Sequence, residues 1–166
     1  MADPSPASSS RATVLVVDDE SSVAKLCVTI LKQGGFDTLS TDGSSEALKI
    51  CKEHPGKIDL LLTDLVLPPP AFQLASSSNE YPHVHGHDLA LRAMHLREGL
   101  RILMMSGNPE KELANYGIKR GSFPFIQKPL DVDTFLQTVR NVLQAPPPTL
   151  TEDASKAAGG DVEWFD

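Results

Sequence analysis

Short apolar runs alternate along this chain with segments in which apolar residues recur every three or four positions. Residues 13–17 and 58–63 are runs of the first kind, and neither shows a helical period. Such runs are typical of strands that are buried on both faces of a parallel sheet. Residues 23–31 instead carry apolar side chains at helical spacing, and Gly34 and Gly35 provide a stop for that helix. The chain therefore begins with a predicted strand followed by a predicted helix.

The same alternation continues to residue 143. The expected strands are residues 13–17, 36–40, 58–63, 100–106 and 122–129, and the expected helices are residues 23–33, 42–54, 86–97, a segment capped by Asn108 that opens at Pro109, and 132–143. Within the later helices we expect these apolar residues to face the core: Leu89, Ala93, Leu96, Val132, Phe135, Leu136, Val139 and Leu143. The alternation predicts an α/β domain that is doubly wound, with a parallel sheet and helices on both faces.

Composition limits what such a domain can do. Lys and Arg number 15 against 22 Asp and Glu, a formal net charge of −7, which argues against nucleic-acid binding because that function needs a basic face. No apolar run approaches the roughly 18 residues of a membrane span, and the N-terminus lacks the apolar core of a signal peptide. We therefore expect a cytoplasmic protein that does not bind membranes. Cys27 and Cys51 fall in helical patterns and read as reduced core thiols.

Both ends of the chain have the composition of tails. Residues 1–10 are rich in Ser, Pro and Ala, and three prolines after Ala145 precede a small, acidic C-terminal segment. Such segments cannot bury enough apolar surface to form a packed core. We therefore expect one folded domain at residues 11–145, between disordered tails at residues 1–10 and 146–166.

Reactive side chains stand where the expected strands end. Asp18, Asp19 and Glu20 follow the first strand, Asp64 follows the third, Ser106 ends the fourth and Lys128 belongs to the end of the fifth. Ligands of open α/β sheets bind at the carboxyl ends of the strands. Carboxylates gathered there repel one another by roughly 1–4 kcal/mol per pair, so a hard cation such as Mg²⁺ is expected to join them. Taken alone, Asp64 also fits a turn or helix-cap aspartate.

Four stretches of the sequence, VLVVDDE, LLLTDLVLP, MMSG and FIQKPL, occur in this order with strand–helix units between them. Together they resemble the receiver domain of bacterial-type two-component response regulators, and most closely the receivers of hybrid histidine kinases. The resemblance covers nearly the whole expected folded part. It implies a flavodoxin-like fold, five parallel strands in the order 2-1-3-4-5, and a role in phosphorelay signal transduction rather than as a conventional enzyme.

The resemblance also assigns roles to the residues at the strand ends. Asp64 matches the phosphoacceptor, a carboxylate that forms an aspartyl phosphate. Asp18 and Asp19 match the acidic pair that binds Mg²⁺, for which Mn²⁺ can substitute, and the main-chain carbonyl of Val66 completes the protein ligands. Lys128 matches the lysine that pairs with Asp64 and then with its phosphoryl group.

Two further matches concern signalling. Ser106 matches the switch hydroxyl, and Phe125 matches the switch aromatic residue. The bond between Lys128 and Pro129 matches one that is usually cis in the family. Glu20 has no role in the acidic pair and is expected to begin the next helix.

One segment departs from the receiver pattern. A glycine usually opens the third helix soon after the phosphoacceptor, whereas the matching Gly86 comes 22 residues after Asp64. The extra residues form an inserted loop at about residues 69–85, and loops of this length are usually functional or disordered. His83, His85 and His87 could converge on a transition metal if this segment is extended. The alternative is a solvated loop that merely contains histidines.

Other functions remain open at this stage. A phosphatase of the haloacid-dehalogenase type also uses an aspartyl nucleophile, but it needs a second Asp two residues later, where this chain has Val66. A pseudo-receiver that binds partners without phosphorylation is a second alternative. A third is a receiver fragment of a hybrid histidine kinase, although the initiator methionine and the acidic tail favour a stand-alone protein.

The expected partners follow from the resemblance to receiver domains. The phosphodonor is a sensor histidine kinase or a histidine phosphotransfer protein, and the target is a downstream protein that the sequence does not identify. No output domain fits in the residues outside the expected domain. The signal is therefore expected to pass by partner binding or by onward phosphotransfer.

Overall fold

The computed structural model describes residues 11–67, 84–115 and 123–148. They form a parallel sheet of five strands in the order β2-β1-β3-β4-β5. The strands are β1 (Thr13–Val17), β2 (Asp37–Thr41), β3 (Leu60–Asp64), β4 (Arg101–Ser106) and β5 (Phe125–Gln127). The helices are α2 (Ser21–Gln33), α3 (Ser44–Glu53), α4 (Gly86–Leu96), α5 (Pro109–Asn115) and α6 (Val132–Gln144). The expected doubly wound fold and its strand order are confirmed. The expected N-terminal tail, most of the C-terminal tail and most of the inserted loop lie outside the described residues.

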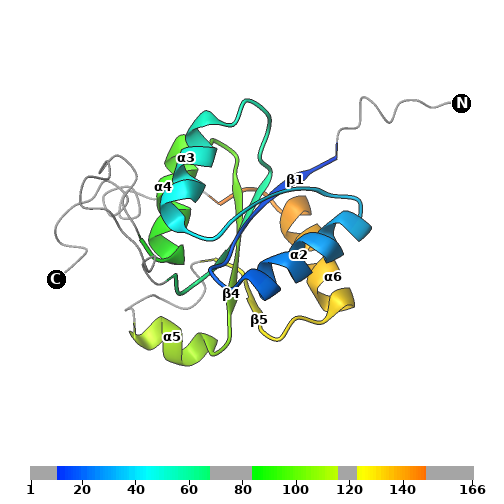
Figure 1. Ribbon diagram of the computed structural model, residues 1–166, viewed down its shortest axis with the longest axis vertical. Helices are drawn as coiled ribbons and strands as arrows, with labels where there is room; N and C mark the ends of the chain where they lie inside the picture. Colours follow the sequence, from blue (N-terminus) through cyan, green and yellow to red (C-terminus); the bar gives the residue numbers. More distant parts are fainter. Residues whose placement is uncertain (1–10, 68–83, 116–122, 149–166) are drawn as a thin grey trace, which may run out of the picture.

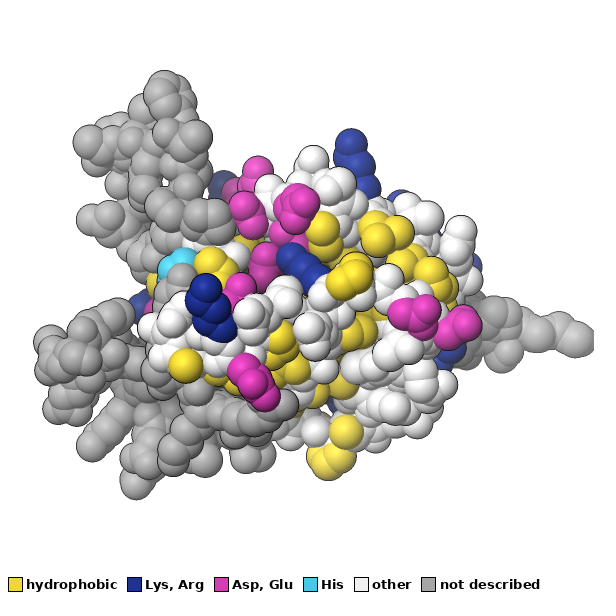
Figure 2. Space-filling model, turned by 90° about the horizontal axis from the view of Figure 1, so that it is seen from below, with side chains coloured by type: hydrophobic (Ala, Val, Ile, Leu, Met, Phe, Trp, Pro, Cys, Tyr) yellow, Lys and Arg dark blue, Asp and Glu magenta, His cyan; other side chains and the backbone are white. Residues whose placement is uncertain are grey.

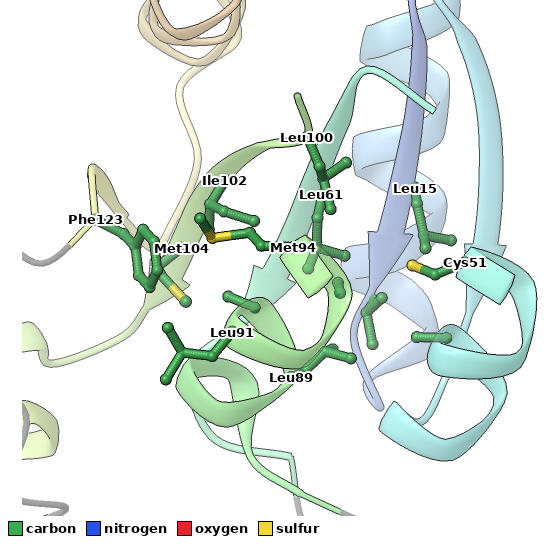
Figure 3. Packing of buried hydrophobic residues seen from close by; sticks show 14 of the residues in the cluster. Leu15, Cys51, Leu61, Leu89, Leu91, Met94, Leu100, Ile102, Met104 and Phe123 are labelled. Atoms are coloured by element: carbon green, nitrogen blue, oxygen red, sulfur yellow. The ribbon is translucent and has the colours of Figure 1, made fainter. Parts of the chain in front are cut away.

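The sheet separates two layers of apolar packing. Helices α2 and α6 cover one face, and α3 and α4 cover the other (Figure 1). Successive strand residues point to opposite faces, so in β3 Leu60 and Leu62 pack beside α2 and α6, whereas Leu61 packs with α3 and α4. Figure 3 shows the second layer, in which Leu61 lies near Met94 of α4. A strand buried on both faces needs the uninterrupted apolar runs that the sequence contains.

The two cysteines lie in different layers. Cys27 of α2 and Cys51 of α3 are buried free thiols, as the helical patterns indicated. Burial raises the pKa of Cys27 to about 12 and that of Cys51 to about 11. Both side chains therefore stay neutral and act as small core residues.

Three large apolar residues of the described helices are exposed. Leu96 and Val132 were expected to face the core, but they are 41% and 46% exposed. Leu96 ends α4 and Val132 begins α6, at positions where each helix leaves the sheet. Leu26 is 45% exposed because Cys27, Ile30 and Leu31 form the stripe of α2 that packs on the sheet. The spacing of apolar residues predicted these helices correctly, but it did not show at which residue each helix stops packing on the sheet.

Strands β2, β3, β4 and β5 all begin later than the apolar runs suggested, and β2 and β3 show the reason. Phe36 is buried, but its N–H donates to the Leu31 carbonyl at 3.0 Å and so belongs to the end of α2. The N–H of Asp37 is the first to bond across to β1, at 2.9 Å from the Ala12 carbonyl. Asp59 contacts Thr13 with both its N–H and its carboxylate, at 2.9 and 2.8 Å, and regular pairing of β3 begins after it.

Arg97 joins the C-terminal ends of α3 and α4. Its guanidinium donates to the carbonyls of Cys51 at 2.7 Å and Gly56 at 2.6 Å, and also to that of His54. These bonds join the end of α4 to the end of α3 and to the loop before β3. This contact could not be expected from the sequence, in which Arg97 is an ordinary polar residue at the end of a helix.

Helix α4 begins directly against β3. The N–H of Gly86 donates to the Leu65 carbonyl at 2.9 Å. A Cβ on Gly86 would lie 2.2 Å from the Asp64 carbonyl oxygen and 3.0 Å from the Leu65 Cα. Gly86 opens the helix, as the receiver pattern implied, because a side chain there would displace the backbone of Asp64.

None of the helices in the described ranges has the length and apolar character that a bilayer crossing requires.

We predict that Gly86→Ala lowers the free energy of unfolding by about 2–3 kcal/mol, because the added methyl group overpacks a rigid backbone contact. Guanidinium chloride unfolding followed by circular dichroism measures the change. Gly107→Ala is the matched control, since a Cβ at Gly107 meets nothing within 4 Å. Equal free energies of unfolding for the two variants would contradict the prediction and would show that the backbone around Gly86 can move apart without loss of stability.

Candidate functional site

Three carboxylates meet at the edge of the sheet where the strands end. The register pairs Val17 with Thr63, so Asp18 and Asp64 leave β1 and β3 side by side. Carboxylate oxygens of Asp18, Asp19 and Asp64 all lie within 4.8 Å of one another. Figure 2 views this end of the molecule, where acidic side chains gather around a cationic one. The structure therefore brings together three of the four acids that stand at the expected strand ends.

Lys128 is the cation that contacts these acids. Its Nζ donates to Asp18 Oδ2 at 2.9 Å and to Asp64 Oδ2 at 3.0 Å. The three side chains are 18%, 0% and 13% exposed, so both ion pairs are largely shielded from solvent. The Lys128 N–H donates to the Ser106 carbonyl at 2.9 Å, and the bond to Pro129 is cis. The predicted contact with Asp64 is present, while the contact with Asp18 was not predicted.

The electrostatics of the site follow from burial and from these contacts. Burial raises the pKa of Asp64 to about 6, and the charge of Asp18 adds to the increase, whereas Lys128 opposes it. Burial would lower the pKa of Lys128, but hydrogen bonds and charges from Asp18 and Asp64 outweigh that effect, and the pKa is raised. A charged lysine shared between two acids leaves the pocket negative once Asp19 is included. Such a pocket attracts a cation.

The carboxylate oxygens suit a hard metal ion. Asp18 Oδ1 accepts from the Glu20 N–H at 2.9 Å, and Asp64 Oδ1 accepts from the Val66 N–H at a longer 3.4 Å. Each oxygen keeps lone-pair capacity beyond these contacts. Asp19 is exposed, so a hydrated ion can reach the group from solvent. The donor set fits Mg²⁺ or Mn²⁺, which bind one or a few carboxylates together with water.

Two expected assignments near the acids have different outcomes. Glu20 is the N-cap residue of α2, as expected. Val66 contacts Asp64 through its N–H, and a metal-binding role for its carbonyl stays a prediction.

Ser106 is at the end of β4 and is completely buried. The register pairs Asp64 with Met105, so Ser106 is one residue beyond the position opposite the acid. Its hydroxyl donates to Glu112 Oε1 of α5 and accepts from the Asn108 N–H at 3.2 Å. Asn108 in turn caps α5, as predicted, by accepting from the Lys111 N–H at 3.3 Å. The contact with Glu112 was missed, because a sequence pattern does not reveal side-chain rotamers.

Phe125 begins β5 opposite Met104 of β4. Its ring is half-buried and packs against the apolar layer that contains α3 and α4. The residue expected to be the switch aromatic is thus partly inside the protein already.

The histidines near the inserted loop make separate contacts. His85 Nδ1 accepts from the Leu67 N–H at 3.0 Å, next to the start of α4. The His87 ring packs on Phe123 with a centroid distance of 5.5 Å, and burial lowers its pKa. His83 lies outside the described residues. Among the described residues, the group able to hold a metal ion consists of Asp18, Asp19 and Asp64.

Comparison with known proteins identifies related domains. Residues 14–71 match the family model of the response regulator receiver domain. The chain is 29% identical over 150 residues to the DNA-binding transcriptional regulator NtrC of Azospirillum brasilense, covering 89% of this chain and 28% of that protein. It is 28% identical over 153 residues to the DNA-binding response regulator MtrA of Mycolicibacterium smegmatis, covering 92% of this chain and 58% of that protein. The chain thus spans less than two thirds of either relative.

Solved receiver structures match the fold. The receiver domain of the hybrid histidine kinase CckA is 25% identical, with a TM-score of 0.60, and the match covers 80% of this chain and all of that domain. A response regulator receiver protein from Sinorhizobium medicae is 21% identical, with a TM-score of 0.63, and the match covers 81% of this chain and 96% of that one. With the strand order and the stretch that matches the family model, these structures show that the chain has the fold of the receiver domains of two-component response regulators.

Proposed function

We propose that this domain is a phosphoacceptor in a phosphorelay and that Asp64 receives the phosphoryl group. The observation that carries the proposal is the position of the Asp64 carboxylate, at the end of β3 and bonded to Lys128 at 3.0 Å. Its side chain is 13% exposed, so a donor can reach a carboxylate that is otherwise enclosed. The donor would be the phosphohistidine of a sensor histidine kinase or of a histidine phosphotransfer protein.

The transfer needs one new bond and one broken bond. A carboxylate oxygen of Asp64 forms a bond to phosphorus while the P–N bond of the phosphohistidine breaks, and the imidazole nitrogen keeps the electron pair. The Lys128 ammonium already contacts Asp64 and is therefore placed to bind a phosphoryl oxygen. Asp18 holds the other side of that ammonium at 2.9 Å and fixes its position.

Asp18, Asp19 and Asp64 are the residues that would hold Mg²⁺, together with the Val66 carbonyl. When bound, the ion supplies positive charge that offsets the charge of the transferring phosphoryl group. Asp18 and Asp64 also bind Lys128, so Asp19 is the acid whose removal least disturbs the protein part of the site.

Ser106 and Phe125 would transmit the change to a partner protein. A phosphoryl group adds negative charge and acceptor oxygens at one point, and it acts at a distance by favouring one of two arrangements. Ser106 ends the strand beside Asp64, and Phe125 begins the strand beside that one. We infer that the Ser106 hydroxyl turns toward the phosphoryl group and that Phe125 moves further into the core.

Two alternatives differ in specific ways. A pseudo-receiver would keep the fold and bind partners without phosphorylation, but its acids would not need the ion pairs with Lys128. A receiver from within a hybrid kinase would carry the same chemistry, and the receiver of the hybrid kinase CckA shares this fold. We propose that phosphotransfer to this domain takes place in the cytoplasm and that the downstream target is a protein.

We predict that incubation with acetyl phosphate and Mg²⁺ adds one phosphate to the protein, which intact-protein mass spectrometry detects. Asp64→Ala should remain unlabelled, because Asp18, the other carboxylate bonded to Lys128, has a side chain with no exposed surface for a donor to reach. A matched control, Asp37→Ala, removes an exposed acid of β2 and should label normally. Equal labelling of Asp64→Ala and the wild type would refute the assignment of the phosphoacceptor.

A second prediction concerns the metal ion. Mg²⁺ at about ten times its dissociation constant should stabilise the fold by about 1.4 kcal/mol. Asp19→Asn should reduce this gain strongly, and thermal unfolding with and without Mg²⁺ measures it.

The gain from Mg²⁺ should also depend on pH. The pKa of Asp64 is about 6 in the fold, above the ordinary Asp value of about 3.9. Ionised Asp64 therefore weakens the metal-free fold above about pH 6, and this effect fades as the pH falls. Because a proton on Asp64 competes with Mg²⁺, the gain should shrink between about pH 7 and pH 5. A gain that stays constant over this range would mean that Asp64 is not a ligand.

A third prediction tests the switch. Phe125 labelled with fluorine should give ¹⁹F resonances whose populations change when beryllofluoride occupies the site as a phosphoryl analogue. The ring is already half-buried, so we expect a shift between two populated states rather than the appearance of a new one. Ser106→Ala should abolish the shift. An unchanged resonance in both proteins would exclude Phe125 from the response.

A further inference from the structure

The hydroxyl of Ser106 is fully engaged in the resting structure. It is completely buried, donates to Glu112 Oε1 and accepts from the Asn108 N–H at 3.2 Å. A serine hydroxyl has one proton to donate. While Glu112 accepts that proton, Ser106 cannot donate to a phosphoryl oxygen on Asp64. The two contacts therefore exclude each other.

We propose that Glu112 is a positioning residue that holds Ser106 in the resting arrangement and thereby sets how readily the domain is activated. This inference rests on the proposed function of Asp64 and adds a restraint from α5. Glu112 is the fourth residue of that helix and lies six residues after Ser106 in the chain. The restraint is therefore built into the turn between β4 and α5.

The chemistry of the acceptor explains why the restraint is effective. A hydrogen bond to a carboxylate is about twice as strong as one between neutral groups. Ser106 is closed to water, so no water molecule can accept its hydroxyl proton in place of Glu112. Breaking the hydrogen bond between Ser106 and the Glu112 carboxylate would therefore cost free energy unless another acceptor is present. The resting arrangement is favoured as long as no stronger acceptor is present.

A phosphoryl group on Asp64 would be that stronger acceptor. It carries a charge of about −1.5 to −2 and three acceptor oxygens. The same charge repels the Glu112 carboxylate while it attracts the hydroxyl proton of Ser106. Phosphorylation would thus weaken the old contact and supply the new one in a single step.

The surrounding backbone places Ser106 where this exchange matters. Leu65, which follows Asp64, donates its N–H to the Met105 carbonyl at 2.8 Å, and Lys128 donates its N–H to the Ser106 carbonyl at 2.9 Å. Ser106 therefore stands between the strand of the acid and the strand of the lysine.

The experiment compares rates of phosphorylation by acetyl phosphate in Mg²⁺. Glu112→Ala should be labelled about tenfold faster than the wild type, because it removes a charge-assisted hydrogen bond from the resting state. Glu112→Gln keeps a neutral acceptor and should be labelled about threefold faster. The control Glu110→Gln removes the same charge from the first turn of the same helix and should leave the rate unchanged. Thermal unfolding of each variant checks that the fold is retained.

The double variant separates positioning from a general effect on stability. In a Ser106→Ala background, Glu112→Ala should not change the rate, because Glu112 acts through the hydroxyl that has been removed. The proposal fails if Glu112→Ala matches the wild type. It also fails if the acceleration persists without the Ser106 hydroxyl.

An NMR measurement on the unphosphorylated protein tests the role of Glu112 independently of the proposed function. The amide NMR signal of Asn108 reports on the Ser106 oxygen, to which that N–H donates. Glu112→Ala should shift this signal in the metal-free protein, and Glu110→Gln should not. If the wild type takes up no phosphate, the proposed function is wrong, and the Asn108 signal still decides whether Glu112 positions Ser106. An unshifted signal overturns that positioning.

Discussion

The site depends on one buried ammonium group shared between two carboxylates. Lys128 reaches from the end of β5 to Asp18 after β1 and to Asp64 at the end of β3, and thereby joins three strands at one edge. Removing the lysine would leave its two buried carboxylates facing each other without a compensating charge, and breaking a buried ion pair in this way costs several kcal/mol. The lysine is itself held by its backbone bond to Ser106, because β5 is too short to fix it by pairing alone. The acids, Ser106 and the fifth strand are thus parts of one arrangement.

Most of the fold could be predicted from the sequence because the strands are apolar on both faces. The run at residues 13–17 became β1 with the expected bounds. Phe36 and Ile58 show the limit of this reasoning, since both are buried in the core but precede regular strand pairing. Burial and membership of a strand are different properties, and an apolar pattern reports the first. Leu96 and Val132 illustrate the same limit at helix ends, where the period continues but the sheet does not.

The candidate site was predictable in its members but not in its contacts. Asp18, Asp64 and Lys128 each follow a strand, and parallel strands end at a common edge, so their proximity follows from topology. The pairing of Lys128 with Asp18, and of Ser106 with Glu112, depends on side-chain rotamers that no spacing rule encodes. Alternation in an extended segment left convergence of the histidines open as one alternative. His85 and His87 make separate contacts on either side of Gly86, and His83 lies outside the described residues.

The two cysteines lie on opposite sides of the sheet, so each can report on the unfolding of its own layer. Cys27 is enclosed between α2 and the sheet, and Cys51 is enclosed in the layer formed with α3 and α4. Neither thiol reacts readily while it is buried and neutral, so its modification requires that its own layer open. The chain therefore contains a natural chemical reporter on each side of the sheet. The relative labelling rates of the two thiols would show whether the helices of one layer detach before those of the other, without any introduced probe.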